Sequence, residues 1–453
     1  MKPKIKTINP YNGKTIAEYE QHSNTEITKI LQKAQNRFED WKKEPISERV
    51  KCLKKISDLL IEKKIELAKL ITTEMGKPIK QSIAEIEKCS WVCDFYAVNA
   101  DNFLADELIE TEAQESFISY DPMGCILAIM PWNFPFWQVF RFAAPNLTVG
   151  NTIILKHASN TTGCALAIQN LFEEAGYPNG CFQSVLADYE QIEQIIENDI
   201  IKAVTLTGSE KAGRKIAAIA GKNLKKSVLE LGGNNACIIW EDADLDTHID
   251  TIVNARMLNA GQSCIAAKRF IVVEAIYKTF LQKFEEKLKS LKSGDPMDET
   301  TEIATLARPD LAEKVQKQVN DSLNKGAKIQ IGNTCDATYF EPSIITNVKA
   351  GMPLYDEEVF GPVASVIKVK DRKESIKIAS DTNFGLGTML FTEDIEAARF
   401  QIDAIEDGSF FINELVKSDP RLPFGGTKIS GYGRELSKEG MLAFVNKKTV
   451  YIK

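Results

Sequence analysis

Three short stretches of the sequence contain the residue types that acyl chemistry at a carbonyl carbon requires. Cys264 ends the run Asn-Ala-Gly-Gln-Ser-Cys, so a thiol follows directly after a Gly-Gln turn. Glu230 begins the run Glu-Leu-Gly-Gly-Asn, and Asn133 is the centre of Pro-Trp-Asn-Phe-Pro. A nucleophile, a general base and an amide donor for an oxyanion are therefore all present. We take Cys264, Glu230 and Asn133 as the candidate catalytic residues.

Each of these residues has a plainer alternative role. A free cysteine is usually packed as a small apolar side chain, a glutamate at a strand end is often salt-bridged, and Asn133 could cap a helix that starts near Pro135. A thiol with a pKa near ~8.5 is only a few per cent ionised at neutral pH, so Cys264 needs a lowered pKa or a base. Apolar surroundings at the end of the strand before Glu230 would raise its pKa towards the range of a useful base.

These runs belong to a set of six motifs that resembles, in order and spacing, the aldehyde dehydrogenase superfamily, and specifically its bacterial succinate-semialdehyde dehydrogenases. The resemblance covers nearly the whole chain. It implies NAD(P)-dependent oxidation of succinate semialdehyde to succinate through a thiohemiacetal and a thioester on Cys264, with Glu230 activating the hydrolytic water. Asn133 and the backbone N–H of Cys264 would stabilise the oxyanion. The six motifs are Pro131–Pro135, Thr207–Ser209, Glu230–Gly233, Gly261–Cys264, Glu358–Pro362 and Pro423–Gly426.

The nucleotide-binding signal in the residues themselves is weak, because the Gly-x-Gly-x-x-Gly fingerprint is absent. Instead, the run from Gly208 through Ser209 to Gly213 follows the predicted strand 203–206, and a glycine turn at a helix N-terminus can hold a pyrophosphate. The resemblance adds specific contacts to the cofactor. It implies that Trp132 borders the nicotinamide, that Lys156 meets the adenosine ribose, that Leu231 also contacts the cofactor, and that Glu358 and Phe360 position the nicotinamide ribose.

The run Lys156-His157-Ala158-Ser159 departs from the common family pattern. In that pattern a proline follows the lysine, and many NAD-preferring members have a glutamate where this chain has Ser159. A carboxylate binds the ribose 2′-hydroxyl and repels a 2′-phosphate, whereas a serine beside a lysine accepts the phosphate. The expected cofactor is therefore NADP or NAD, with NADP favoured. His157 has no assigned role.

Substrate selection is predicted from Trp137 and Arg141. If Pro135 opens a helix, these residues fall on one face, a turn apart, downstream of Asn133. An aromatic wall and a guanidinium would select an aldehyde with a distal carboxylate. In similar succinate-semialdehyde dehydrogenases an arginine at this place binds the carboxylate, with help from a hydroxyl near Ser418. The alternative for Arg141 is an interior ion pair.

The helices and strands that position these residues are predicted from the spacing of apolar residues along the chain. Apolar spacing predicts amphipathic helices over 23–42, from about 45 to 75 and over 78–103, and the first carries a Ser-x-x-Glu capping box. Short β-rich runs then alternate with helices, which indicates a doubly wound parallel sheet. The runs are 125–130, 152–155, 182–186 and 203–206.

The alternation restarts after Leu231 with a strand at 236–240, a long helix from 245 to about 260, a strand at 269–273 and a helix from 276 to about 291. We expect an aldehyde dehydrogenase-like α/β fold of two α/β domains, with a Rossmann-like cofactor domain. The predicted divisions are a cofactor-binding domain over 1–231, a catalytic thiol domain over 232–420 and a C-terminal return over 421–453. The resemblance implies that an excursion at 114–124 forms a small oligomerisation sheet with the tail 445–452, in a homodimer or homotetramer.

Composition limits the partners. A net charge of -7 and a pI near 5.4 argue against nucleic acid and anionic membranes, which both need a basic face. The nine cysteines are odd in number and scattered, which is typical of a reducing compartment. Cys89 and Cys93 are four apart, but no second ligand pair follows, so no metal is expected. The N-terminus lacks the apolar core of a signal peptide. We expect a cytoplasmic enzyme that acts on a small aldehyde.

Four alternatives remain open at this stage. Another carboxyl-bearing semialdehyde, such as glutarate semialdehyde, or an aliphatic aldehyde could be the substrate. A CoA-acylating enzyme would release the thioester to CoA instead of water. A Cys-dependent hydrolase would reduce no nicotinamide. A non-catalytic protein of the same fold would be supported by loss of Cys264, Glu230 or Asn133, and all three are present.

Overall fold

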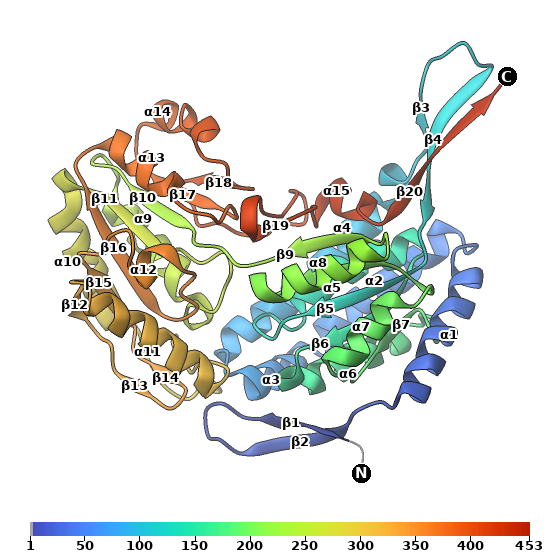
Figure 1. Ribbon diagram of the computed structural model, residues 1–453, viewed down its shortest axis with the longest axis horizontal. Coiled ribbons are helices and arrows are strands. Elements are labelled where there is room, and N and C mark those ends of the chain that lie inside the picture. Colours follow the sequence, from blue (N-terminus) through green and yellow to red (C-terminus); the bar gives the residue numbers. More distant parts are fainter. Residues whose placement is uncertain (1–2) are drawn as a thin grey trace.

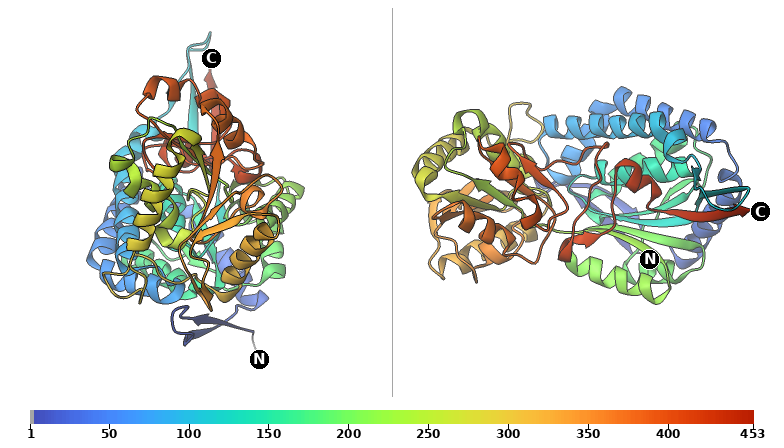
Figure 2. Two further views of the ribbon diagram at one scale, coloured as in Figure 1. Left: turned by 90° about the vertical axis from the view of Figure 1, so that its left-hand side faces the viewer. Right: turned by 90° about the horizontal axis from the view of Figure 1, so that it is seen from above.

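The computed structural model describes residues 3–453 and contains two α/β units, each built on its own sheet (Figure 1). Figure 2 shows the units side by side along the long axis, with the C-terminus projecting from the far end of the first. Residues 231–235 connect the last parallel strand of one sheet to the first strand of the other. The predicted α/β class with parallel sheets is confirmed.

Of the N-terminal helices of the first unit, α1 packs on one face of its sheet and α2, α3 and α4 belong to the core on the other face. Helix α1 carries the predicted capping box, in which Ser23 and Glu26 exchange hydrogen bonds. The single helix predicted over 45–75 is wrong, because the backbone leaves helical geometry at Lys63 (φ −95°, ψ 9°) and two helices result. The helices are α1 (Asn24–Trp41), α2 (Ile46–Glu62), α3 (Lys64–Met75) and α4 (Ile79–Phe103).

The first sheet has six strands in the order β19-β9-β8-β5-β6-β7, and all neighbours are parallel except β19, which is antiparallel to β9. The chain runs outward from β5 to β7 on one side and then from β8 to β9 on the other, so the topological switch point lies between β5 and β8. The strands are β5 (Cys125–Met130), β6 (Thr152–His157), β7 (Phe182–Ser184), β8 (Ile201–Thr207), β9 (Lys226–Glu230) and β19 (Gly431–Tyr432).

Side chains alternate between the two faces of this sheet, as a pleated strand requires. On β5, Ile126 and Ala128 join the core formed with α2, α4 and α5, whereas Cys125 and Leu127 join the core formed with α1, α7 and α8. Both faces are covered, which explains the nearly continuous apolar run of the strand. The helices that follow the strands are α5 (Trp137–Val149), α6 (Thr162–Glu174), α7 (Tyr189–Glu197) and α8 (Glu210–Lys222), with a 3-10 turn η1 (Ser159–Thr161).

The second sheet has seven strands in the order β12-β15-β16-β11-β10-β17-β18, and only β12 is antiparallel to its neighbour. Its helices pack on both faces and form two separate apolar cores. The strands are β10 (Ala236–Ile239), β11 (Arg269–Val273), β12 (Lys328–Ile331), β15 (Ser343–Thr346), β16 (Val363–Val369), β17 (Thr388–Phe391) and β18 (Phe410–Ile412). The helices are α9 (Leu245–Met257), α10 (Glu274–Ser290), α11 (Pro309–Leu323), α12 (Pro353–Asp356), α13 (Arg372–Ser380) and α14 (Ile395–Arg399).

A projecting three-stranded sheet joins distant parts of the chain (Figure 1). Strand β4 (Glu115–Pro122) pairs antiparallel along its full length with β20 (Val445–Ile452), and β3 (Glu107–Leu108) lies on the other edge of β4. The predicted pairing of the excursion with the tail is therefore confirmed. Helix α15 (Ser437–Leu442) precedes β20.

Two short hairpins were not predicted. Strands β1 (Lys4–Ile8) and β2 (Thr15–Glu20) form an antiparallel pair before α1, and β13 (Cys335–Asp336) pairs with β14 (Tyr339–Phe340). The first strand of the N-terminal hairpin is short, and its alternating burial is carried by only two buried residues, Ile5 and Thr7. None of the helices within residues 3–453 combines the length and the apolarity needed to cross a membrane.

Candidate active site

The loop that carries the predicted nucleophile Cys264 begins as soon as α9 ends. The 3-10 turn η2 (Leu258–Gly261) follows, and Asn259 and Ala260 have positive φ angles of 54° and 51°. Gly261 continues this left-handed backbone with φ of 72°. Consecutive left-handed residues reverse the chain within a short distance, at a cost that a functional loop often carries. The long helix predicted to reach Ala260 is therefore too long, because these residues turn away from the helix axis.

Side-chain amides hold this loop against the first unit. Asn133 Nδ2 donates to the carbonyl oxygen of Gln262 (3.0 Å), and Asn259 Nδ2 donates to the carbonyl oxygen of Asn133 (2.9 Å). Asn235 Nδ2 donates to the carbonyl oxygen of Cys264 (2.6 Å). The buried amide of Asn133 uses one hydrogen in this way, so its second hydrogen is free to donate to a substrate oxygen. The proposed alternative of a helix cap at Asn133 is not seen, since Phe136 is the N-cap residue of α5.

Lys268 ties the same loop to the second unit, a role that the sequence did not suggest. Its Nζ donates to the carbonyl oxygens of Ser263 (2.7 Å) and Cys264 (2.6 Å) and lies 3.4 Å from Oε1 of Glu358. Burial lowers the pKa of Lys268 to about 8, while the charge of Glu358 opposes the shift. The backbone around the thiol and the predicted ribose-binding Glu358 are thus linked through one buried cation.

The surroundings of Cys264 favour the protonated form of its thiol. Burial raises its pKa to about 11, against the opposing charges of Lys268 and Arg141. Because the thiolate is the reactive form, an acceptor for the proton is needed during the reaction. Glu358 and Glu230 are both close enough for their charges to raise the thiol pKa further.

Glu230 ends β9 and is almost completely buried (2% exposed). Burial raises its pKa well above the usual range, the nearby Glu435 adds to the shift, and Arg141 and Arg434 oppose it. Among the described residues 3–453, neither carboxyl oxygen has a hydrogen-bond partner. A neutral carboxyl group already carries its proton, so it must lose that proton, with water or a nearby positive charge stabilising the carboxylate, before it can act as a base. The sequence had also predicted that the pKa of Glu230 would be raised.

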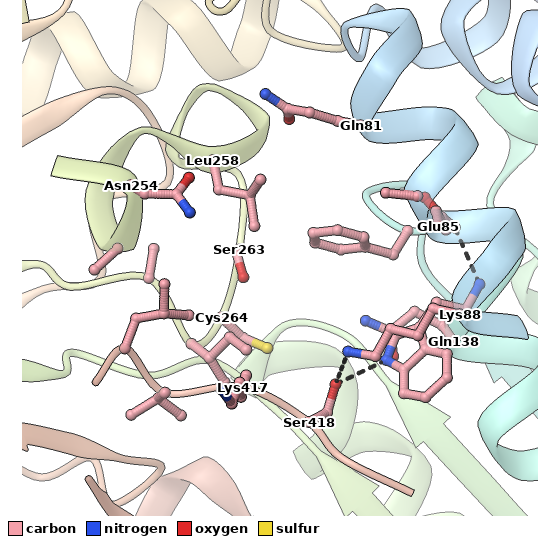
Figure 3. Close-up of a pocket in the computed structure, with 18 of the residues that line it drawn as sticks. Gln81, Glu85, Lys88, Gln138, Asn254, Leu258, Ser263, Cys264, Lys417 and Ser418 are labelled. Atoms are coloured by element: carbon pink, nitrogen blue, oxygen red, sulfur yellow. Dashed lines mark hydrogen bonds between the residues drawn. The ribbon is translucent and has the colours of Figure 1, made fainter. Parts of the chain in front are cut away.

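A cavity of about 320 Å³ lies in front of Cys264, between the two units (Figure 3). We call it the thiol cavity. Its walls are mostly apolar, and its charged or polar lining includes residues of α4, α5 and the segment before β19. Figure 3 shows the sulfur of Cys264 directed into this space, which Ser418 and the end of Lys88 that is hydrogen-bonded to it also face. All three predicted substrate-binding residues, Trp137, Arg141 and Ser418, line it.

Arg141 lines the cavity but is already paired. Its Nε forms an ion pair with Glu435, its Nη2 donates to Thr207 Oγ1 (3.2 Å), and its guanidinium lies 4.8 Å from the ring centroid of Phe424. Both members of the ion pair are buried, at 2% and 3% exposed side chain. This is the interior ion pair that the sequence left open as an alternative. Glu435 itself was not identified from the sequence, because nothing in its local run distinguishes it.

Trp137 and Ser418 meet a third residue, Lys88 of α4. Trp137 Nε1 and Lys88 Nζ both donate to Ser418 Oγ, at 3.0 Å and 2.9 Å. The Lys88 ammonium also lies 4.3 Å from the centroid of the Trp137 ring. Glu85, one turn before Lys88, accepts from the backbone N–H groups of Phe136 and Trp137 and thereby holds the start of α5 against α4. Sequence inspection missed Lys88, although its spacing of three from Glu85 on a helix was a usable signal.

The predicted cofactor residues of the first unit gather at the carboxyl ends of β5, β6, β8 and β9, which we call the carboxyl edge. Ser209 is the N-cap of α8 and accepts from the backbone N–H of Ala212 (3.3 Å). Gly213 packs so closely on Leu231 that an added Cβ would lie 2.6 Å from a leucine methyl. Gly208 lies between the end of β8 and this helix start. Ligands of doubly wound sheets bind at this edge, beside the switch point.

Lys156 and Ser159 extend the carboxyl edge on the β6 side. Lys156 is the second-last residue of β6, and burial lowers its pKa. Ser159 is exposed and begins η1, so its hydroxyl is open to a ligand. The exposed ring of Tyr189 lies 5.9 Å from Lys156 Nζ. The edge thus presents a lysine, a hydroxyl and an aromatic face.

The remaining cofactor residues approach from the second unit. Phe360 contacts Trp132 edge to face, with centroids 5.8 Å apart and an interplanar angle of 88°. Glu358 Oε1 accepts from the backbone N–H of Gly233 (3.1 Å). A Cβ at Gly232 would meet the Glu358 carboxylate, so glycine allows the carboxylate to come this close to the backbone. Trp132, Phe360 and Glu358 therefore lie between the carboxyl edge and the thiol loop.

His157, which had no predicted role, connects the two regions. It accepts from the backbone N–H of Ala158 at Nδ1 (2.8 Å), so its Nε2 carries the hydrogen that it donates to the carbonyl oxygen of Pro135 (2.9 Å). Burial lowers its pKa to about 4, which keeps the ring neutral. The end of β6 is thereby attached to the loop that carries Asn133.

The cysteines other than Cys264 show no sign of reactivity. All nine are free thiols, and burial raises the pKa of both Cys89 and Cys93 well above the usual range. No group of three or more His, Cys, Asp or Glu residues suited to a metal ion was found in the part of the chain from 3 to 453.

Comparison with known proteins places this geometry in context. The family model described as the aldehyde dehydrogenase family matches residues 1–450. The probable succinate-semialdehyde dehydrogenase [NADP(+)] of Synechocystis sp. is 47% identical over 451 residues, which cover 99% of each chain. The succinate-semialdehyde dehydrogenase [NADP(+)] of Mycobacterium avium is 44% identical over 455 residues, covering 99% of this chain and 96% of that protein. The crystal structure of the Streptococcus pyogenes succinic semialdehyde dehydrogenase with NADP+ superposes with a TM-score of 0.97 at 38% identity, covering 99% of each chain.

Proposed function

The chain belongs to the aldehyde dehydrogenase family, and we propose that it oxidises succinate semialdehyde to succinate with NADP as the electron acceptor. The observation that carries this proposal is the thiol cavity, which combines Cys264 with a distal ammonium and hydroxyl, Lys88 and Ser418. An apolar cavity with a nucleophile at one side and a cation at another suits a short aldehyde with a carboxylate at its far end. The relatives named above point to the same substrate and cofactor.

In the proposed reaction, the Cys264 thiolate attacks the aldehyde carbon and forms a thiohemiacetal. The oxyanion receives hydrogen bonds from the free Asn133 amide hydrogen and from the backbone N–H of Cys264. When bound, NADP supplies the nicotinamide carbon that accepts the hydride, and a thioester remains on Cys264. Glu230, once ionised, removes a proton from water, which attacks the thioester and releases succinate.

The carboxyl edge fits an NADP molecule by the chemistry of its groups. The α8 N-terminus at Gly208 and Ser209 offers backbone N–H groups to a pyrophosphate. Lys156 and the exposed Ser159 offer a cation and a hydroxyl to a 2′-phosphate, with no carboxylate at position 159 to repel it. Leu231, packed on Gly213, would form the floor of this edge. On the other side, Glu358 would bind the nicotinamide ribose.

Phe360 and Trp132 would flank the nicotinamide, where their edge-to-face contact lies next to the thiol loop. The same geometry leaves NAD usable, because no group at the carboxyl edge requires the phosphate. NADP is nevertheless expected to give the lower KM.

Three further assignments accompany this function. The sheet of β3, β4 and β20 is proposed to pair subunits into a homodimer or homotetramer, since Leu108, Tyr451 and Ile452 are exposed on it. We also propose that the chain is divided into a cofactor-binding domain (1–231), a catalytic thiol domain (232–420) and a C-terminal return (421–453). The nine free thiols suit a cytoplasmic location.

A second candidate substrate follows from the same cavity. Glutarate semialdehyde carries the same two functional groups, one methylene further apart, and a methylene changes binding in an apolar pocket by only about 1–3 kcal/mol. The comparison of kcat/KM for the two semialdehydes decides between them.

The test is formation of reduced nicotinamide when purified protein is mixed with succinate semialdehyde and NADP or NAD. Turnover that is lost in Cys264→Ala supports the nucleophile and the reaction class. No turnover with any aldehyde in the wild-type protein would contradict the proposed function. Turnover with butanal but not with succinate semialdehyde would contradict only the substrate.

A further inference from the structure

Lys268 is a buried cation four residues after the nucleophile, and the reaction as proposed above gives its charge no function. Its side chain is 1% exposed, and its Nζ donates to the carbonyl oxygens of Ser263 (2.7 Å) and Cys264 (2.6 Å). Within residues 3–453 the carboxylate paired with it is that of Glu358, whose side chain is 20% exposed and whose Oε1 lies 3.4 Å away. Burying an ammonium group costs free energy, so such a residue is expected to have a structural or a chemical role.

The two carbonyl groups do not depend on the ammonium for their hydrogen bonds. The carbonyl oxygen of Ser263 also accepts from the backbone N–H of Ala266 (3.2 Å), and that of Cys264 also accepts from Nδ2 of Asn235 (2.6 Å). An apolar side chain of similar length in place of Lys268 would therefore leave neither carbonyl unpaired. The positive charge itself points to a role in the chemistry at the thiol.

The hydrogen bond to Ser263 fixes the peptide group that contains the Cys264 N–H. A trans peptide group is planar, and its C=O and N–H point in opposite directions. Because the C=O of Ser263 is turned towards Lys268, the N–H of Cys264 is turned away from the ammonium. In the described chain from 3 to 453 this N–H has no hydrogen-bond partner, so it is free for the substrate oxyanion. A cation bound at the carbonyl end also polarises the peptide group and makes its N–H a stronger donor.

The same charge acts on the sulfur of Cys264. Burial raises the pKa of the thiol, and the positive charge of Lys268 opposes this rise more than the charge of Arg141 does. Charges interact more strongly in a buried site than in water, so a fixed cation there favours the thiolate. The thiolate and the oxyanion are thus two negative charges that one ammonium group can stabilise.

We propose that Lys268 is a positioning residue that stabilises the negative charges formed at Cys264. It orients and polarises the Cys264 N–H that receives the oxyanion, and its charge favours the thiolate. It touches neither the substrate nor the reacting atoms. This assignment rests on the proposed function and concerns a residue outside the six sequence motifs.

The first test measures the thiol in the absence of substrate and cofactor. At about pH 7 Lys268 is mainly charged, because its pKa is about 8: burial and Arg256 lower it, while Glu358 and Cys264 oppose the shift. Lys268→Met should lower the rate of Cys264 alkylation by iodoacetamide at this pH roughly 3- to 10-fold, since less thiolate is present without the cation. Mass spectrometry of the labelled peptide gives the rate.

The second test measures kcat and KM for succinate semialdehyde and for butanal, with saturating NADP. Lys268→Met should lower kcat roughly 10-fold for both aldehydes, which is less than the about 10²- to 10³-fold loss expected when a whole oxyanion donor is removed. KM for either aldehyde should change little, because the oxyanion forms only after the aldehyde has bound. Lys278→Met, which removes an exposed charge on α10, is the matched control.

The outcomes separate this assignment from the proposed function. In Lys268→Met that is folded, judged by its melting temperature, an unchanged alkylation rate overturns the assignment, and so does an unchanged kcat with a raised KM, which would show a loosened loop. If the wild-type protein oxidises no aldehyde, the proposed function fails, and the alkylation rates alone decide whether the cation acts on the thiol.

A second variant covers the case in which Lys268→Met does not fold. Lys268→Gln has a shorter, neutral side chain that still donates hydrogen bonds, and the same fall in alkylation is expected because the charge is absent. Failure of both variants to fold would show that Lys268 is needed for the fold and would overturn the assignment.

Discussion

The carboxyl edge of the first sheet and the thiol cavity hold their functional groups by different means. At the carboxyl edge, backbone geometry does most of the positioning, through strand ends, the α8 N-terminus and the close contact of Gly213 with Leu231. Around the thiol cavity and the loop of Cys264, buried ion pairs do most of the positioning, between Arg141 and Glu435 and between Lys268 and Glu358. A site built by backbone tolerates changes of side chain, whereas one built from buried ion pairs does not.

This difference predicts that substitutions in the cavity should cost more than equivalent substitutions at the carboxyl edge. The expected effects below run from the largest to the smallest.

Arg141→Met should lower the free energy of unfolding by about 3–5 kcal/mol, because Glu435 would remain buried without a partner beside Glu230. Thermal melting measures the loss. The double variant Arg141→Met with Glu435→Met should recover a large part of it, since a buried charge is removed with its partner. A single variant that melts like wild type would show that the ion pair does not stabilise the cavity.

Asn133→Ala should lower kcat about 10²- to 10³-fold, because one of the two oxyanion donors is lost. KM should change little, since the donor acts mainly on the tetrahedral intermediate. The same variant also loses the hydrogen bond to Gln262, so its melting temperature should be recorded alongside. A fall confined to KM would contradict the oxyanion role.

Alkylation of Cys264 by iodoacetamide in the cofactor-free protein should rise with pH, about tenfold per unit between pH 7 and 9, because the thiolate reacts and the thiol pKa is about 11. Mass spectrometry of the labelled peptide gives the rate, and Cys264→Ala identifies labelling at other cysteines. A plateau below pH 9 would mean that the thiol is activated before any ligand binds.

Ser159→Glu tests the carboxyl edge. The added carboxylate should repel a 2′-phosphate and bind a 2′-hydroxyl, which shifts the ratio of kcat/KM from NADP towards NAD by roughly 10- to 100-fold. Ser159→Gln, which has the same length without the charge, is the control. An unchanged ratio in the glutamate variant would place the 2′-phosphate elsewhere.

Ser209→Ala removes the side-chain cap of α8 and should cost only about 1 kcal/mol of stability, with a modest rise in KM for the cofactor. The backbone N–H groups that face the pyrophosphate remain. A loss of cofactor-binding free energy in Ser209→Ala as large as the loss of unfolding free energy in Arg141→Met would contradict the distinction between the two regions.

Local patterns were sufficient for much of the fold. The capping box at Ser23, the alternation of strands and helices and the apolar runs of β5 and β6 depend on neighbouring residues, and they were predicted correctly. The break at Lys63 and the end of α9 at Met257 were missed. Both lie in runs with good helical periodicity, where the packing of distant segments decides the backbone.

For the functional residues, the sequence by itself determined which chemical groups are available and which family motifs contain them. It did not determine which charges pair. For Arg141 the sequence left a carboxylate-binding role and an interior ion pair both open, and the structure shows an ion pair with Glu435, far away in the sequence. Lys88 was not noticed, and the structure brings it to Ser418 across 330 positions of the chain. The net charge available to a ligand in a buried site depends on every neighbour in three dimensions, so only the tertiary structure could decide it.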